Sequence, residues 1–386
     1  MAYLDYAATT PVRSEVVTLI TEALQSEFGN PSSLYQQGKK AKRLLDQARQ
    51  QVAEVLHVSA SSVYFTSGAT EANNWAIRSQ AYQARATTNR NHIVCTAIEH
   101  PSVMEVCHAL EKEGFDVSYV LPNPSGAMTV EQFVAHTTEQ TSGWIAMAVN
   151  NEVGSVLPIE ALGEAARARG LWFHVDAVQA IGKLPFEPNC TSLSSSGHKL
   201  YAPKGIGVLV YQPWVDLPLQ AFLQGGGQEK GKRSGTENVP YILGYAHALK
   251  LAQEEQQALQ QHFAELSEYL YAQLAQHHIA YERNGHTQVP YIHSLWLKNH
   301  LASQILIQMD LANIAISAGS ACSAGSVQPS KILQAYYPEE PTRWQESVRI
   351  SFGKQTTTAD IDAFITQIKQ LNERKSTLWH SQNKQN

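Results

Sequence analysis

Short apolar runs of strand length alternate along the chain with segments whose apolar residues recur at helical spacing. The apolar runs lie at 62–67, 92–98, 117–122, 143–150, 171–177 and 204–211. Helix-length connections between strands imply parallel pairing, and runs that are apolar throughout imply strands buried on both faces. The pattern therefore predicts an α/β fold, with a large domain whose mostly parallel sheet lies between helices.

Beyond this alternation the pattern becomes continuously helical from about Val239 to His277. A pattern of that length indicates a connecting helix, whole or broken, that leads to a second unit. The remaining chain mixes short strands with helices, which predicts a small α+β domain. We therefore expect a large domain over 15–255 and a small domain made of 1–14 and 256–386.

The composition argues against several classes of partner. The chain has 386 residues, 43% of them hydrophobic, and a net charge of −5. A slightly acidic chain without runs of Lys or Arg does not favour nucleic acid or an anionic membrane as a partner. No apolar run approaches the roughly 18 residues that span a bilayer, and the N-terminus lacks the pattern of a secretion signal. We expect a cytoplasmic protein.

The four cysteines lack CxxC spacing, which favours neither a disulfide framework nor a metal site. Cys95 and Cys107 lie in apolar contexts and are expected in the core, and Cys190 is expected in an ordinary connection. Cys322 differs, because the stretch 317–326 around it reads SAGSACSAGS. Such a stretch has little apolar surface to pack and favours a flexible loop. Cys322 is then either a residue without a role in a flexible connection or a reactive thiol that must move.

The stretch FTSGATEANN at 65–74 places a strand, a glycine-bearing turn and a helix in direct succession. Free N–H groups at the start of such a helix favour a phosphate, and Ser67 or Thr70 would add a hydroxyl. The stretch is neither GxGxxG nor a P-loop, so a capped helix without any ligand stays open at this point.

Two charged residues follow at predicted strand ends. Asp176 stands in WFHVDAVQA, at the carboxyl end of a predicted hydrophobic strand, where parallel sheets hold their ligands. Lys199 stands in SSSGHKLY, a turn before a glycine-rich return, whereas Lys204 lacks that context. An exposed strand end would also satisfy Asp176 without any ligand, and a lysine at such a turn is normally solvated. Together with the phosphate turn they supply what pyridoxal 5′-phosphate requires, namely a phosphate cradle, an acid for the ring nitrogen and a lysine.

A series of short motifs carries a resemblance to a known family. In chain order they are YLDYAATTP, FGNPSS, FTSGATEANN, EHPSV, NNEVG, HVDAVQAIGK, SSGHKLYAPKGIG, GGGQEKGKRSGTEN and SAGSACSAG. Their order and intervals resemble those of the cysteine desulfurases of the NifS/IscS type, which are fold-type-I pyridoxal-phosphate enzymes. The resemblance covers Tyr3 to about Ser351, and the combination is specific although each single motif is weak.

The resemblance implies roles for the residues at matching positions. Lys199 would bind the cofactor covalently, His100 would stack on its ring and move protons, and Asp176 would meet the ring nitrogen. Asn151 and Arg349 would hold the substrate carboxylate. The implied cofactor-binding residues are Ala69, Thr70, Asn151, Asp176, Gln179 at the phenolic oxygen, Ser196, His198, Lys199 and Thr236.

The resemblance also implies a homodimer, in which Thr236 reaches the phosphate in the partner subunit. In this branch of the family a cysteine lies on a loop beside the active site, so Cys322 would be the catalytic nucleophile. The implied reaction converts the substrate L-cysteine to L-alanine and leaves the sulfur on Cys322 as a persulfide. Sulfur-acceptor proteins, such as an iron–sulfur cluster scaffold or a thiolation relay, would then receive it.

Other functions stay open beside this one. They are a selenocysteine lyase, an aminotransferase of the same fold, and a non-catalytic sulfur carrier in which Cys322 is loaded by other proteins. An aminotransferase has no use for a loop thiol, and a carrier needs no lysine, acid or phosphate site. The sequence departs from the family after FGNPSS, where Leu34 and Tyr35 stand in place of a common histidine. Tyrosine does not exchange protons near neutral pH, so no proton role is expected there.

Overall fold

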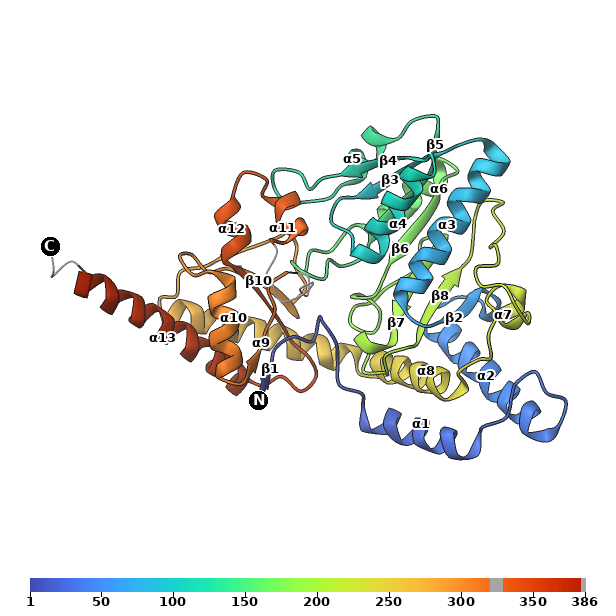
Figure 1. Ribbon diagram of the computed structural model, residues 1–386, viewed down its shortest axis with the longest axis horizontal. Coiled ribbons are helices and arrows are strands. Elements are labelled where there is room, and N and C mark those ends of the chain that lie inside the picture. Colours follow the sequence, from blue (N-terminus) through green and yellow to red (C-terminus); the bar gives the residue numbers. More distant parts are fainter. Residues whose placement is uncertain (320–328, 383–386) are drawn as a thin grey trace. The chain divides into compact units, whose positions relative to one another are not determined.

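The computed structural model describes residues 1–319 and 329–382, with side chains described as far as Glu373. The chain divides into two compact units. The large unit comprises Thr9–Asn150 and Val156–Gln257. The small unit comprises Met1–Ala8, Asn151–Ser155 and Ala258–Asn386. Figure 1 labels the elements of both units.

The large unit is built on a seven-stranded sheet within the described residues (Figure 1). Its strands are β2 (Val63–Thr66), β3 (His92–Thr96), β4 (Asp116–Val120), β5 (Thr141–Met147), β6 (Trp172–Asp176), β7 (Ser192–Ser196) and β8 (Gly207–Tyr211). Their spatial order is β2-β8-β7-β6-β5-β3-β4. Among these strands β8 runs opposite to the other six, so that its pairings with β7 and β2 are antiparallel and the remaining pairings are parallel. The predicted α/β fold with a mostly parallel sheet is confirmed.

The sequence pattern passes over strand β7, because its residues, SLSSS, are mostly serine. All of them are nevertheless buried between β6 and β8. Two of their hydroxyls are paired inside the protein: Ser192 Oγ accepts a hydrogen bond from Gln80 Nε2 at 2.9 Å, and Ser195 Oγ accepts one from Tyr245 OH at 2.7 Å. Ser194 Oγ is buried without a hydrogen-bond partner in the described part of the chain. Paired polar groups can be buried without a large penalty, and this is why an apolar pattern does not find the strand.

Helices connect and cover these strands. They are α1 (Ser14–Ser26), α2 (Gln36–Val55), α3 (Ala69–Thr88), α4 (Pro101–Lys112), α5 (Val130–His136), α6 (Ile159–Ala168), α7 (Gln228–Gly231) and α8 (Val239–Glu254). Local signals set several of their ends: Pro101 opens α4, Thr129 and Gln132 form a capping box before α5, and Gly170 follows α6 with a left-handed φ of 63°.

The core of the large unit lies where α3 and α4 meet the sheet. Ile77 of α3 and Val103 of α4 pack in one cluster with Ile93 of β3. Cys95 and Cys107 are fully buried in the same cluster, as the sequence predicts. This packing fixes the ends of the helices that begin at the carboxyl edge of the sheet.

The predicted long helix is broken, since α8 ends at Glu254 and α9 spans Gln256–Gln276. The small unit contains an antiparallel sheet in the order β12-β10-β9 and a parallel pair of β1 with β11. The strands are β1 (Ala2–Tyr3), β9 (Glu282–Arg283), β10 (Ile292–Trp296), β11 (Ile314–Ala315) and β12 (Ser347–Ser351). Its other helices are α10 (Ala302–Leu311), α11 (Lys331–Tyr336), α12 (Pro341–Glu346) and α13 (Thr358–Gln382). No helix in the described part of the chain is both long and apolar enough to cross a membrane.

Candidate active site

The carboxyl ends of the parallel strands meet at one edge of the large unit's sheet, and most predicted cofactor residues stand there. β2 ends at Thr66, shortly before α3 begins at Ala69. β6 ends at Asp176, and β7 ends at Ser196, directly before the short 3-10 helix η2 (Gly197–Lys199). β2 and β7 point the same way because each is antiparallel to β8. Ligands of α/β sheets bind at such an edge.

The turn between β2 and α3 forms an open cradle. The N-terminus of α3 has no side-chain cap within the described residues. A Cβ added at Gly68 would meet only Ser196 Oγ, at 3.8 Å, so the space beside the turn is open. A Cβ on Gly207 would lie 2.6 Å from Gly68 Cα, and only glycine allows β8 to approach the turn so closely. Free N–H groups and the positive end of a long helix, beside a serine hydroxyl, suit a phosphate.

Asp176 presents a buried, fixed carboxylate at the end of β6. The residue is 5% exposed. Asn73 Nδ2 donates to its Oδ2 at 3.0 Å, and the backbone N–H of Val178 donates to its Oδ1 at 3.1 Å. A carboxylate has more acceptor positions than these two bonds use. Asp176 can therefore accept one further hydrogen bond from a protonated ring nitrogen without rearrangement.

A chain of buried hydrogen bonds that the sequence does not predict lies behind Asp176. His174 Nε2 lies 2.9 Å from Asn73 Oδ1, and His174 Nδ1 lies 2.8 Å from Ser192 Oγ. Gln80 donates to the same Ser192 hydroxyl. Burial lowers the pKa of His174 to about 3, so the ring is neutral near pH 7. Because Asn73 uses its amide N–H groups as donors, its Oδ1 accepts the proton of His174 Nε2.

Lys199 lies half-buried at the end of η2. The adjacent His198 has a fixed backbone, since its carbonyl accepts a hydrogen bond from the N–H of Thr10 at 2.9 Å. Burial, together with the charges of Lys199 and other nearby lysines, lowers the pKa of His198 to about 4. Lys204, by contrast, is exposed. The structure thus separates the two lysines of this motif by their surroundings.

His100 is the N-cap residue of α4. The backbone N–H of Ser102 donates to His100 Nδ1 at 3.1 Å, so that nitrogen is an acceptor and the neutral ring carries its proton on Nε2. The pKa of His100 is lowered from its ordinary value, chiefly because the ring is desolvated. The Lys199 charge lowers the pKa as well, and the Asp176 charge opposes part of the shift. His100, Asp176 and Lys199 therefore lie within electrostatic reach of one another.

Asn73 is the residue of this site that the sequence analysis missed. It lies four residues after Ala69 on α3, a spacing that puts both on the same face of the helix. Its Nδ2 also donates to Ser102 Oγ at 2.9 Å. Asn73 thereby links the carboxylate of Asp176 to the residue that fixes His100. The polar pair in TEANN, one turn into a helix that starts at a phosphate turn, was the available signal.

Two more predicted cofactor residues of the large unit are Gln179 and Thr236. Gln179 is 3% exposed, and its Oε1 accepts a hydrogen bond from Lys183 Nζ at 2.7 Å. Thr236 is exposed and lines a cavity of about 190 Å³ together with Thr66 and Ser67. The placement of Thr236 at a partner subunit's phosphate stays a prediction.

Asn151 and Arg349 lie together in the small unit. Arg349 Nη1 donates to the carbonyl of Asn151 at 2.8 Å, and Nη2 pairs with Asp5 Oδ1 at 2.7 Å. In the described part of the chain, Arg349 Nε and Asn151 Oδ1 are buried without a hydrogen-bond partner. A buried guanidinium N–H that lacks an acceptor suits a substrate carboxylate. Asp5, which the sequence analysis also missed, holds the guanidinium in place.

The predicted nucleophile, Cys322, lies outside the described residues. Leu34 and Tyr35, which replace the family's common histidine, are exposed. The other cysteines, Cys95, Cys107 and Cys190, are all buried. Burial raises the pKa of the Cys95 and Cys190 thiols. None of these three thiols is placed to act as a nucleophile on a bound substrate.

These observations fit pyridoxal 5′-phosphate. The open turn at Gly68 matches a phosphate, Asp176 retains acceptor capacity for a protonated ring nitrogen, and His100 presents an imidazole beside them. Lys199 supplies an amine at the same edge of the sheet. The donor set contains a cradle, an acid and an amine, which is what this cofactor needs from a protein.

Comparison with known proteins gives the same picture. The "putative cysteine desulfurase IscS 1" of Bacillus subtilis (strain 168) is 38% identical over 364 residues, or 93% of this chain and 95% of that protein. The "cysteine desulfurase IscS" of Pectobacterium atrosepticum is 38% identical over 376 residues, or 95% of this chain and 91% of that protein.

Solved structures are similar over nearly the same length. A "NifS-like protein" superposes with a TM-score of 0.88 at 32% identity, covering 96% of this chain and 99% of the other. "SspA in complex with cysteine" superposes with a TM-score of 0.79 at 32% identity, covering 91% and 99%. A family model described as aminotransferase class-V matches residues 2–364. From this match and these relatives, the chain belongs to the class-V aminotransferase family, among its cysteine desulfurases.

Proposed function

We propose that this protein is a pyridoxal-phosphate-dependent cysteine desulfurase, which converts L-cysteine to L-alanine and moves the sulfur to Cys322. One observation carries the proposal: a single edge of the sheet brings together the uncapped start of α3, the fixed Asp176 carboxylate, His100 and Lys199. The relatives that bear the name cysteine desulfurase, and a similar structure solved with cysteine, support the substrate.

The residues of the large unit would hold the cofactor, with Asn151 of the small unit as a further contact. Lys199 Nζ would bind its aldehyde, Asp176 would accept the proton of its ring nitrogen, and Gln179 would reach its phenolic oxygen. The phosphate ligands would be the start of α3 at Ala69 and Thr70, with Ser196 and His198. When bound, the cofactor supplies an electron sink for the carbon that loses its proton.

Two residues would move protons. Lys199 Nζ would take the proton from the α-carbon of the substrate, acting as a general base. His100 would exchange a proton with the substrate thiol at Nε2, because its Nδ1 is already an acceptor of the Ser102 N–H. The lowered pKa of His100 keeps this ring neutral near pH 7. The neutral ring has its proton on Nε2 and would therefore meet the substrate sulfur as a proton donor at that atom.

Arg349 and Asn151 would bind the substrate carboxylate, with Asp5 fixing the guanidinium. The Cys322 thiolate would attack the substrate sulfur, so that a bond forms between the two sulfurs while the bond from sulfur to the β-carbon breaks. The persulfide would then pass to an acceptor such as an iron–sulfur cluster scaffold. We further propose a homodimer, in which Thr236 reaches the phosphate in the partner subunit.

The test is incubation of the full-length holoenzyme with L-cysteine and a reductant, which should release alanine and sulfide in equal amounts. Lys199→Ala should abolish both products, whereas Lys204→Ala, at an exposed lysine, should keep them. Cys322→Ser should lose sulfide, and without reductant the parent should carry an extra sulfur on the Cys322 peptide. A keto acid as product, or an active Cys322→Ser variant, would contradict the proposal.

A further inference from the structure

The edge segment, residues 225–237, lies along the free edge of β2, the last strand of the sheet in the described chain. Side chains take the place of a further strand there. The backbone N–H of Phe65 donates to Glu229 Oε2 at 3.0 Å, and the carbonyl of Val63 accepts from Arg49 Nη1 at 2.8 Å. Backbone groups at a sheet edge need such partners when they are covered. The edge segment is therefore attached directly to the strand that leads into the phosphate turn.

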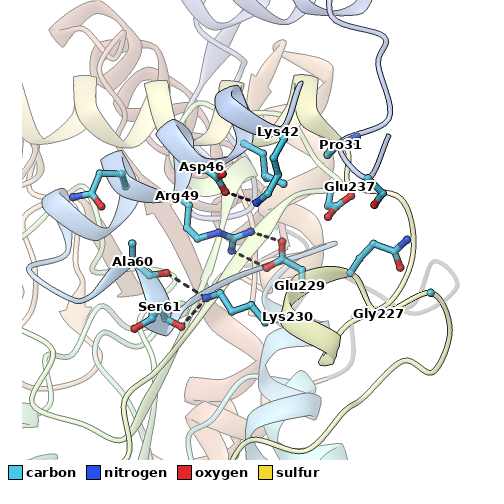
Figure 2. Close-up of a pocket in the computed structure, with 15 residues that line it drawn as sticks. Pro31, Lys42, Asp46, Arg49, Ala60, Ser61, Gly227, Glu229, Lys230 and Glu237 are labelled. Atoms are coloured by element: carbon cyan, nitrogen blue, oxygen red, sulfur yellow. Dashed lines mark hydrogen bonds and ion pairs between the residues drawn. The ribbon is translucent and has the colours of Figure 1, made fainter. Parts of the chain in front are cut away.

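A buried ion pair holds this attachment. Arg49 of α2 donates to both carboxylate oxygens of Glu229, at 2.8 and 2.6 Å, and its guanidinium lies 4.8 Å from the centre of the Phe65 ring. The two side chains are 9% and 3% exposed. Figure 2 shows Arg49 pointing at Glu229 in the wall of a cavity of about 630 Å³, with the exposed Lys42–Asp46 pair beside it.

The backbone of the edge segment is strained at this contact. Glu229 and Lys230 have left-handed φ values of 47° and 59°, although neither is glycine. Lys230 Nζ donates to the carbonyls of Ala60 and Ser61, at 3.3 and 2.6 Å (Figure 2). Strained residues of this kind persist only where surrounding contacts determine them, and they occur chiefly at functional positions. Here the side chains of the strained residues themselves provide those contacts.

Hydrogen bonds within the edge segment connect the backbone next to Glu229 with the backbone next to Thr236. The residue before Glu229, Gln228, accepts through Oε1 from the N–H of Gly235 at 2.9 Å. The N–H of Gly227 donates to Ser234 Oγ at 3.2 Å. The two halves of the segment are thus bonded to each other next to Glu229 on one side and next to Thr236 on the other.

We propose that Glu229, paired with Arg49, is a positioning residue that sets the place of Thr236. The inference rests on the proposed function, in which Thr236 binds the cofactor phosphate. The ion pair fixes the strained turn, the turn fixes Gln228, and Gln228 fixes the backbone beside Thr236. Glu229 itself acts only through the edge segment.

The test measures how fast pyridoxal 5′-phosphate leaves the full-length holoenzyme, followed by absorbance with excess apo-acceptor as a trap. Thr236→Ala should raise the rate about ten- to a hundredfold, which corresponds to the loss of one hydrogen bond to a charged group. Glu229→Gln keeps an acceptor for the Phe65 N–H but loses the charge, and it should raise the rate several-fold. The double variant should lose cofactor no faster than Thr236→Ala alone, because both changes remove one interaction.

Two further variants complete the design. Asp46→Asn breaks the exposed ion pair in the wall of the same cavity and should leave the rate unchanged. Arg49→Lys keeps the charge but loses the bidentate contact, and it should raise the rate as Glu229→Gln does, so a poorly folding Glu229→Gln does not end the test. Additive effects in the double variant, or an unchanged rate in Glu229→Gln and Arg49→Lys, would overturn the positioning role alone. An unchanged rate in Thr236→Ala would overturn both this role and the proposed phosphate contact.

Discussion

Two buried polar clusters of the large unit hold functional positions by different means. At the centre of the sheet, behind Asp176, the chain from Gln80 through Ser192, His174 and Asn73 consists of neutral hydrogen bonds. At the edge of the sheet, β2 is covered by the charged pair of Arg49 and Glu229. The central cluster orients one carboxylate, and the edge cluster orients a whole segment of backbone.

The two clusters differ because one orients a carboxylate and the other holds a strained backbone. The neutral ring of His174 fixes Asn73, and Asn73 in turn fixes the Asp176 carboxylate, without adding a positive charge that would compete with the cofactor's ring nitrogen for that carboxylate. The edge segment has strained backbone at Glu229 and Lys230, and a bidentate pair of opposite charges in a buried place resists its relaxation more strongly than neutral bonds do. The charged pair therefore lies where the backbone is strained, at Glu229 and Lys230. Neutral groups lie behind Asp176, where an added charge would alter the affinity of that carboxylate for the ring nitrogen.

The largest effect should come from removing one charge at the edge. Arg49→Met leaves the Glu229 carboxylate buried without its partner, which should lower the free energy of unfolding by about 3–5 kcal/mol. The double variant Arg49→Met/Glu229→Leu should recover part of this loss, because no buried charge is left. Urea unfolding of the three proteins measures both values. A single variant as stable as the parent would contradict the importance of the pair.

A smaller effect should come from acid acting on the central cluster. The pKa of His174 is about 3 when folded, against about 6.5 in an unfolded chain. The unfolded state therefore binds the extra proton first, and the stability from the neutral ring is complete above about pH 6.5 and lost as the pH falls toward 3. Between pH 7 and pH 5 the loss should be about 2 kcal/mol.

His174→Gln serves as the comparison, because glutamine keeps a donor and an acceptor but does not titrate. Unfolding measured at pH 7 and pH 5 should show a weaker pH dependence in this variant than in the parent. Equal pH dependence in the two proteins would mean that other groups account for the acid sensitivity.

The smallest effect should come from the ion pair of Lys42 and Asp46, which lies near Arg49 but is about half exposed. Asp46→Asn should change the free energy of unfolding by less than about 0.5 kcal/mol, because exposed pairs are screened by water. Both variants break an ion pair in the wall of the same cavity, one exposed and one buried. The difference between their free energies of unfolding therefore measures the effect of burial. A loss as large as that of Arg49→Met would remove this distinction.

Sequence patterns predict the parts of this fold that depend on apolar burial. The strand at 92–98 and the helix opened by Pro101 are found because their signals are local. Strand β7 is missed, since its burial depends on hydroxyl partners such as Gln80, which is far away in the chain. A pattern that counts apolar residues carries no information about partners of that kind.

The candidate site divides in the same way. Asp176 and Lys199 stand at strand ends, where topology alone brings chemistry-bearing side chains together. Asn73 and Asp5 are missed because their roles depend on which atoms they meet, Asp176 and Ser102 in one case and Arg349 in the other. Contacts between distant segments become visible only in the folded chain.

The burial of Cys95, Cys107 and Cys190 also makes the protein convenient for chemical labelling. Their side chains are at most 1% exposed, and alkylating reagents attack accessible thiolates. The folded chain should therefore protect all three from a brief exposure to iodoacetamide. Any label taken up rapidly would then be assigned to Cys322, the remaining cysteine of the chain. Protection of its peptide by bound substrate or by a transferred sulfur could be measured without mutating the other cysteines.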